Sequence, residues 1–178
     1  MALFALIDSD NFYVSVERIF DSTIHDRPVI VLSSGDGCVI ARSNEAKDLG
    51  IVMGAPVFRY RRLIEEKHIA IFSSNFQLYQ DISDRIAAIL ATFSEQPPER
   101  YSIDECFLSL NHVAPGEAET VGREIRARIL QFVGVPCSVG VNFGIPWAES
   151  VQVCERGRTH PSREEKPCFG FVSASREM

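Results

Sequence analysis

The sequence predicts an α+β fold in which a split βαββαβ sheet is interrupted by an inserted module. Short apolar runs bounded by charged or turn residues predict the strands. Two longer segments with apolar residues every three or four positions predict helices on one face of the sheet. The third observation is the order of these segments along the 178 residues: strand, inserted module, helix, two strands, helix and strand.

The first strand and the inserted module occupy the N-terminal part of the chain. Residues 3–8 are an apolar run that ends in Asp8, which is typical of a buried central strand. Asp10 is placed to cap a helix over residues 11–20, whose apolar side chains fall at helical spacing. The rest of the module is expected to hold a hairpin, two helices and a third strand, over residues 28–33, 38–42, 44–49, 58–66 and 69–72.

The second part of the sheet contains the two helices with the clearest periodicity, over residues 75–93 and 117–132. From about residue 142 the apolar pattern is lost, so residues 142–178 are predicted to form a divergent, irregular tail. Between and after the helices we expect three further strands, over residues 100–104, 105–110 and 136–141.

Composition limits the classes of protein to which the chain can belong. A hydrophobic fraction of 46% is enough for a packed core, and the sequence shows neither an apolar run of about 18 residues nor a cleavable leader. We therefore expect a cytoplasmic protein with no membrane partner. The net charge of −6 argues against broad nucleic-acid binding, because phosphate contacts need Lys and Arg. The five cysteines form no Cys-x-x-Cys pair, which favours buried thiols over a zinc site.

Three acidic residues interrupt the apolar strands. Asp8 ends the first strand, and Asp104 and Glu105 lie where two later strands meet. Burying carboxylates is costly unless a cation pairs with them, and hard oxygen ligands suit Mg²⁺. Two such ions about 4 Å apart could hold the attacking and leaving oxygens of a phosphoryl transfer. The pattern alone leaves open that these acids only mark the ends of loops.

Two groups of basic residues are candidates for phosphate contacts. Lys47 follows Arg42, Ser43 and Asn44 near the start of a short helix, where a triphosphate could bind. A solvated lysine on an exposed helix is the alternative. The second group is a stripe of three arginines around Tyr60, which could touch a nucleic-acid backbone or form a solvated helix face: Arg59, Arg61 and Arg62.

Four motifs stand out along the chain. They are Ala-Leu-Ile-Asp-Ser-Asp-Asn-Phe-Tyr at 5–13, Gly-Cys-Val-Ile-Ala-Arg-Ser-Asn-Glu-Ala-Lys at 37–47, Phe-Ser-Ser-Asn-Phe-Gln-Leu-Tyr at 72–79 and Tyr-Ser-Ile-Asp-Glu-Cys-Phe at 101–107. In this order and at this spacing they resemble the Y-family (translesion) DNA polymerases, and in particular the bacterial UmuC branch, the catalytic subunit of the SOS lesion-bypass polymerase. The resemblance covers residues 3–141.

The resemblance implies an organisation into parts. The split sheet would be a ferredoxin-like polymerase palm, formed by residues 1–10 and 75–141, and the small α/β fingers module would be inserted at residues 11–74. The thumb and little-finger domains of the family, which carry much of its basic DNA-binding surface, are expected to be absent. Their absence would account for part of the negative charge.

The resemblance also implies roles for single residues. Asp8, Asp104 and Glu105 would be the catalytic acids and would bind two Mg²⁺ ions, with help from the main-chain carbonyl of Ser9. Tyr13 would block a ribose 2′-hydroxyl, and Phe12 would pack against the nascent base pair. The other expected nucleotide contacts are Ser43, Asn44 and Lys47.

The function implied is error-prone translesion DNA synthesis in DNA repair and the SOS response, by Mg²⁺-dependent nucleotidyl transfer from a dNTP to a primer 3′-hydroxyl. The expected partners are a dNTP, a damaged DNA primer-template and, for a full-length protein, a UmuD-like accessory subunit and a recombinase filament. The alternative is a catalytically inactive palm and fingers remnant that only binds nucleotide or partners. A palm-type nucleotidyl cyclase is a third interpretation, which the motifs around Tyr13 and residues 44–47 disfavour.

The chain departs from the family after residue 141. The family continues with a lysine-containing segment that helps to bind the triphosphate, whereas this chain has no lysine between Lys67 and Lys166. We therefore expect a truncated or frame-disrupted form with weak DNA binding and weak or undetectable primer extension.

Overall fold

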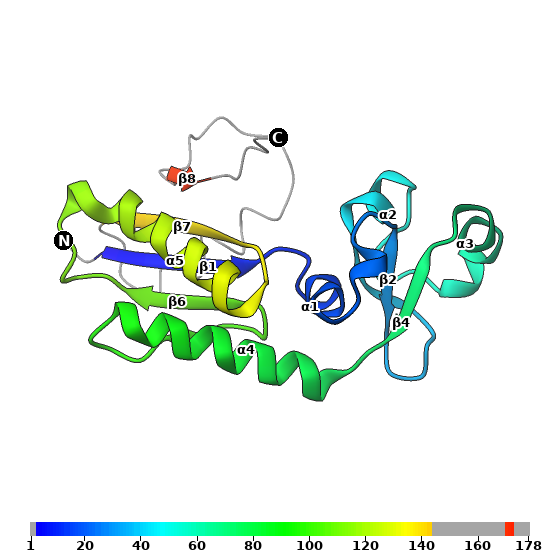
Figure 1. The fold of residues 1–178 in the computed structure, drawn as a ribbon, viewed down its shortest axis with the longest axis horizontal. Helices are drawn as coiled ribbons and strands as arrows, with labels where there is room; N and C mark the ends of the chain where they lie inside the picture. Colours follow the sequence, from blue (N-terminus) through cyan, green and yellow to red (C-terminus); the bar gives the residue numbers. More distant parts are fainter. Residues whose placement is uncertain (1–2, 144–169, 173–178) are drawn as a thin grey trace. The chain divides into compact units, whose positions relative to one another are not determined.

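The computed structural model describes residues 3–143 and 170–172. The chain forms two compact units, each drawn from separate stretches of the sequence (Figure 1). The first unit comprises Met1–Asp8, Ala87–Arg128 and Cys137–Met178, and the second comprises Ser9–Ile86 and Ile129–Pro136.

The first unit is built on a five-stranded sheet with the strand order β5-β6-β1-β7-β8. In β1 (Leu3–Ser9), every second side chain from Leu3 to Ile7 is buried, and β1 pairs antiparallel with β6 (Glu105–Ser109). The other strands are β5 (Glu99–Arg100), β7 (Cys137–Phe143) and β8 (Gly170–Val172).

Helix α5 (Ala118–Val133) packs on β7 through a glycine. A Cβ atom added at Gly122 would lie 3.6 Å from the Val139 side chain and 3.7 Å from that of Val141, so the helix backbone approaches the strand closely. Ile125 and Ile129 follow at helical spacing and are fully buried. The buried face of this helix therefore includes Ile125 and Ile129, as the apolar spacing predicts, but Phe132, which was expected to face inward, is 69% exposed, and Val133 is buried in its place at the end of the helix.

The second unit contains a three-stranded sheet of order β3-β2-β4. All four side chains of β2 (Val29–Leu32) are buried, and this strand pairs antiparallel with β3 (Val39–Arg42) and parallel with β4 (Ala70–Ser73). The helices of the described chain not yet given are α1 (Phe12–Phe20), α2 (Asn44–Asp48), α3 (Arg61–Lys67) and α4 (Phe76–Leu90), with 3₁₀ turns at Ser22–Ile24, Val57–Tyr60, Ala91–Phe93 and Pro115–Glu117.

Three expectations need correction. Helix α1 begins at Phe12, and its N-cap is Asn11 in the left-handed conformation (φ 47°, ψ 45°) rather than Asp10. The strand expected over residues 100–104 ends at Arg100, because a turn follows. The expected helix 58–66 is divided into a 3₁₀ turn and α3.

The tail predicted over residues 142–178 lies mostly outside the described residues. Where it is described, it includes regular structure: β7 continues to Phe143, and β8 pairs antiparallel with it at Val139–Val172. Among the helices of the described chain, none is long and apolar enough to span a bilayer. The mixed α and β architecture agrees with the expected fold class.

Candidate functional site

Two of the predicted acidic residues face each other across neighbouring strands. The antiparallel register of β1 and β6 places Asp8 opposite Glu105, next to the pair formed by Ile7 and Cys106. Directly opposed residues carry their side chains on the same face, with Cβ atoms about 4.5–5.5 Å apart. Glu105 is buried, with 8% of its surface exposed, whereas Asp8 is exposed. The pairing of β1 with β6 therefore brings two carboxylates from distant parts of the sequence together at one end of these two inner strands.

The third acid, Asp104, is held by the turn that precedes β6. The backbone N–H groups of Tyr101 and Ser102 donate to the carbonyl oxygen of Glu105, at 3.1 and 3.2 Å. The Ser102 hydroxyl oxygen accepts from the N–H groups of Glu105 at 3.0 Å and Asp104 at 3.3 Å. The same hydroxyl donates to the Asp104 carboxylate. Ser102 thus fixes the position of Asp104 directly beside Glu105.

The chemistry of these three side chains fits a hard cation. Carboxylate oxygens are the ligands that Mg²⁺ accepts in proteins, together with water and substrate phosphates. Within residues 3–143 and 170–172, however, no three His, Cys, Asp or Glu side chains are gathered closely enough to hold a metal ion. The structure thus pairs Asp8 with Glu105 and places Asp104 next to them along the chain, without a preformed three-carboxylate cage. Ser9, whose carbonyl was expected to assist, is buried at the end of β1.

A second group of predicted residues meets on the surface of the second unit. The Lys47 ammonium donates to Asn11 Oδ1 at 2.6 Å and to Asn44 Oδ1 at 3.1 Å. The Asn11 amide nitrogen in turn donates to Asn44 Oδ1 at 3.2 Å. An ammonium has three donors, so Lys47 is oriented by two amide oxygens and keeps a proton for an anion. This arrangement suits a phosphate group.

Asn11 is a member of this group that the sequence prediction missed. Its left-handed backbone turns the chain from β1 into α1 and directs its amide toward Asn44 and Lys47. Asparagine adopts positive φ more readily than most residues, so an Asn directly before an apolar helical stretch was the available signal.

Ser43 has a structural role that differs from the predicted one. It is fully buried, and its hydroxyl oxygen accepts from the N–H of Ala46 at 3.2 Å and from the N–H of Val29 at 3.1 Å. The first bond caps α2 and the second ties the helix to β2. Its assignment to nucleotide binding stays a prediction, and its described contacts are with the backbone of Val29 and Ala46 and with the Glu45 side chain.

Tyr13 belongs to an aromatic cluster in the second unit. Its ring stacks on Tyr79 with 4.4 Å between centroids and an interplanar angle of 24°, and it meets Phe76 edge-on at 6.1 Å. The Tyr79 hydroxyl donates to Glu17 Oε1 at 2.7 Å. Burial raises the pKa of Tyr79 above its usual value, and the Glu17 carboxylate raises it further. Tyr13 therefore stacks on a buried, uncharged ring that limits its movement. Phe12, in contrast, is itself a core residue with 4% exposure.

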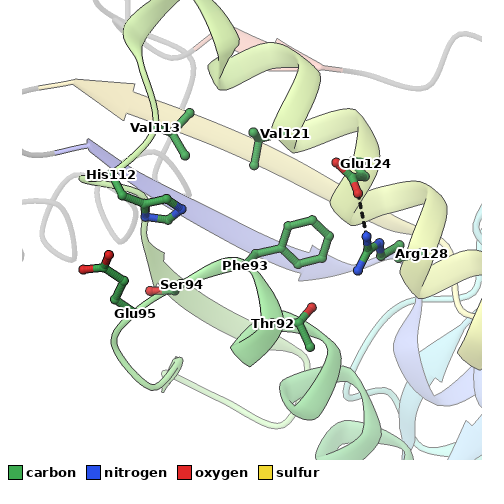
Figure 2. Close-up of a pocket in the computed structure, with 9 residues that line it drawn as sticks. All are labelled: Thr92, Phe93, Ser94, Glu95, His112, Val113, Val121, Glu124 and Arg128. Carbon is green, nitrogen blue, oxygen red and sulfur yellow. Dashed lines mark hydrogen bonds and ion pairs between the residues drawn. The ribbon is translucent and has the colours of Figure 1, made fainter.

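A groove of about 400 Å³ lies elsewhere in the first unit (Figure 2). Arg128 pairs with Glu124 at 2.8 Å, and its guanidinium carbon lies 4.9 Å from the centre of the Phe93 ring. His112 and Val113, which line the groove, follow the C-terminal end of β6, whereas the acidic residues lie at the N-terminal end of that strand. None of the predicted site residues lines this groove.

Comparison with known proteins gives consistent results. Residues 7–145 match the model of the family described as impB/mucB/samB. Protein ImpB of Salmonella typhimurium is 46% identical over 154 residues, which are 84% of this chain and 35% of ImpB. Protein UmuC of Salmonella typhimurium strain LT2 is 44% identical over 142 residues, 78% of this chain and 33% of UmuC. DNA polymerase IV 2 of Mesorhizobium japonicum is 34% identical over 137 residues, 75% of this chain and 31% of that protein.

The chain therefore spans about a third of the length of these curated relatives. Among solved structures, the insertion ternary complex of Dbh DNA polymerase is similar with a TM-score of 0.74 and 24% identity, over 83% of this chain and 44% of that chain. At this identity the likeness concerns the fold. The resemblance to the UmuC branch seen in the sequence motifs is confirmed by the curated relatives.

Proposed function

Because the chain belongs to the impB/mucB/samB family, we propose that it carries the nucleotide-binding catalytic part of an error-prone translesion DNA polymerase. The reaction is template-directed transfer of a nucleotide from a dNTP to a primer 3′-hydroxyl. The observation that carries the proposal is the register of β1 and β6, which opposes Asp8 and Glu105 and places Asp104 beside them. Relatives named UmuC and DNA polymerase IV support the same reaction.

In this proposal the palm comprises residues 1–10 and 75–141, and the fingers comprise residues 11–74. Strand order supports a split βαββαβ palm: along the sheet the strands run β7, β1, β6, β5, and the pairs β1–β6 and β5–β6 are antiparallel. Helix α4 precedes β5 in the chain and α5 connects β6 to β7, which is the connectivity of that motif. The proposed fingers contain the complete three-stranded sheet of the second unit.

The acidic residues have defined parts in the chemistry. Asp8, Asp104 and Glu105 would hold two Mg²⁺ ions, with the carbonyl of Ser9 as a further ligand. When bound, Mg²⁺ supplies activation of the 3′-hydroxyl and neutralisation of the charge on the phosphates. The protein contributes position: Ser102 holds the Asp104 carboxylate by a hydrogen bond, so this side chain loses little freedom when it binds an ion.

The second unit would bind the nucleotide. Lys47, oriented by Asn11 and Asn44, would donate to the triphosphate. Tyr13 would exclude a ribose 2′-hydroxyl, and its stack on Tyr79 gives the ring the rigid support that such exclusion needs. Phe12 would pack beneath the nascent base pair as part of the core. Ser43 would hold the start of α2, and with it Asn44 and Lys47, in position.

The proposed partners follow the family. They are a dNTP, a damaged primer-template, and the UmuD-like subunit and recombinase filament expected for a UmuC-like protein. The last two rest on the resemblance to UmuC alone.

Primer extension with Mg²⁺ tests the proposal on the full chain. We expect Asp104→Ala to lower extension at least about 100-fold, because metal ligands contribute several kcal/mol to the transition state. Asp81→Ala is the matched control, since Asp81 is an exposed acid that pairs with Arg85 on α4. Measurable extension that is equal in wild type and Asp104→Ala would contradict the proposal.

A binding measurement separates the polymerase from a remnant that only binds nucleotide. Calorimetric titration of dNTP in the presence of Mg²⁺ should give binding that weakens in Asp104→Ala and in Lys47→Ala. Binding without any extension would favour the remnant, whereas the absence of both binding and extension would refute each function.

A further inference from the structure

An exposed arginine patch lies on the second unit, outside the residues that the proposed chemistry uses. We define it as Phe58, Arg59, Arg61 and Arg62, which belong to the 3₁₀ turn Val57–Tyr60 and the start of α3. Phe58 is 62% exposed, and the Arg62 side chain is 92% exposed. Exposed aromatic side chains occur elsewhere on the chain, but Phe58 is the one followed in sequence by three arginines within four residues.

The segment that carries the patch is firmly attached to the core. Its other side chains, Val57, Tyr60, Leu63 and Ile64, pack against the buried cluster around Ile30, Leu32 and Ile51. The Tyr60 hydroxyl also accepts from the N–H of Val52 at 2.9 Å. The patch residues are thus presented outward by a segment whose inner side is fixed, which keeps the entropy lost on binding small.

The arginines are available for an anionic partner. Arg62 pairs with Glu66 at 2.7 Å, one turn further along α3. Within the part of the chain that the structure describes, the guanidinium groups of Arg59 and Arg61 form no hydrogen bond or ion pair. Glu65 and Glu66 lie toward the C-terminal end of this helix together with Lys67, whereas Arg61 and Arg62 lie in its first turn and Arg59 in the 3₁₀ turn before it. The patch is therefore a local excess of positive charge on a chain whose net charge is −6.

The apolar surface extends beyond Phe58. Val52 and Met53 are 57% and 52% exposed, and the hydrogen bond from Val52 to Tyr60 places them beside the 3₁₀ turn. A ring with apolar neighbours and unpaired guanidinium groups is the combination that binds unpaired bases and their phosphates together. A duplex would use the cations, but its paired and stacked bases would not stack on the ring. An acidic protein would also use the cations and would give the ring only apolar contact, whereas an unpaired base stacks on it.

We propose that the arginine patch binds single-stranded DNA, with a base stacked on Phe58 and phosphates on Arg59 and Arg61. The strand would be the unpaired template, and this identification rests on the proposed polymerase function. The patch would add affinity for the template strand that does not depend on the acidic residues or on nucleotide binding.

Fluorescence anisotropy of a labelled oligothymidylate, measured on the full chain in EDTA, tests the inference without any need for catalysis. Phe58→Ala should weaken binding about 5-fold or more, the loss typical of one stacked base. Its matched control is Phe20→Ala, since Phe20 is 63% exposed and lies outside the patch. The double variant Arg59→Gln/Arg61→Gln should lower the slope of log affinity against log salt by about 1.4, which corresponds to two phosphate contacts on a single strand.

Arg85→Gln/Arg123→Gln is the matched charge control, because both arginines are exposed on helices and pair with a carboxylate four residues earlier. Circular dichroism melts will show whether each variant is folded. Wild-type affinity in Phe58→Ala and in the double arginine variant would overturn the inference, even where Asp104→Ala abolishes extension. Binding of polyglutamate as tight as that of the oligonucleotide, with no effect of Phe58→Ala, would also overturn it in favour of an acidic protein partner.

Discussion

Replacing Tyr79 by Phe removes one buried hydroxyl group and keeps the ring on which Tyr13 stacks. The hydroxyl donates to Glu17 Oε1 at 2.7 Å, and Tyr79 itself is fully buried. A hydrogen bond to a charged acceptor contributes about 1.5–3 kcal/mol. Glu17 is half-buried and can turn to water when the hydroxyl is lost. We therefore expect the free energy of unfolding to fall by about 1.5 kcal/mol, at the low end of that range.

For a chain of this size, 1 kcal/mol corresponds to about 2–4 °C in Tm, so Tyr79→Phe should lower Tm by about 3–6 °C. Urea and thermal unfolding followed by far-ultraviolet circular dichroism measure both quantities. Tyr79→Ala also removes the ring and should cost about 3–5 kcal/mol, the range for truncating a large buried aromatic residue.

A double-mutant cycle with Glu17→Ala identifies the source of the loss. If the hydrogen bond carries it, Tyr79→Phe will cost much less in the Glu17→Ala background than in the wild type. An equal cost in both backgrounds would refute the assignment, as would a Tyr79→Phe variant with wild-type stability.

The pKa of Tyr79 gives the same bond a pH dependence. Burial and Glu17 raise the pKa of the folded phenol above the unfolded value of about 10. A raised pKa means that the stabilisation is complete below pH 10 or so and is lost as pH rises further, when the unfolded state releases its proton first. The stability difference between wild type and Tyr79→Phe should therefore be constant from about pH 7 to 9 and shrink above about pH 10.

Three further outcomes are expected. Gly122→Ala should raise the free energy of unfolding by about 0.5–1 kcal/mol, because the added methyl group meets only ordinary van der Waals contacts inside a helix. Gly134→Ala should lower it by more than about 1 kcal/mol, because φ is +84° at that position, and urea titration measures both changes. Burial raises the pKa of the Cys106 thiol to about 11, so iodoacetamide at pH 8 should alkylate Cys38 before Cys106, as mass spectrometry will show. Lys47→Ala should weaken Mg²⁺-dependent dNTP binding roughly 10-fold in calorimetry, and unchanged affinity would remove this residue from the site.

The parts of the fold that depend on apolar periodicity could be predicted from the sequence. Helices α4 and α5 each bury a stripe of side chains, and strand β1 buries an alternating row. The spacing of the apolar residues predicts which side chains are buried in each case. The turn before β6 could not be predicted in this way. Its conformation depends on the Ser102 hydroxyl and on two N–H groups that meet the Glu105 carbonyl, and such local polar bonds leave no mark on apolar spacing.

The aromatic support of Tyr13 escaped prediction for a different reason. Tyr79 was correctly placed on the inward face of its helix, but a single sequence does not state which distant residue it will meet. The stack depends on how α1 and α4 pack within the second unit, and nothing in the spacing of either helix identifies Tyr13 as the partner. Asn11 escaped in the same way, because its amide is useful only after α1 and α2 have come together.

The acidic pair shows how site and core depend on each other. The identity of the acids could be read from the sequence, but their opposition depends on a register that pairs Ile7 with Cys106 and Asp8 with Glu105. A shift of one residue would turn one strand over, moving its buried side chains to the other face and separating the carboxylates. Burial of Ala5 opposite Leu108 opposes that shift, so apolar packing three pairs away from the acids holds them in register. The proposed metal site is therefore specified as much by the apolar residues of β1 and β6 as by the acids themselves.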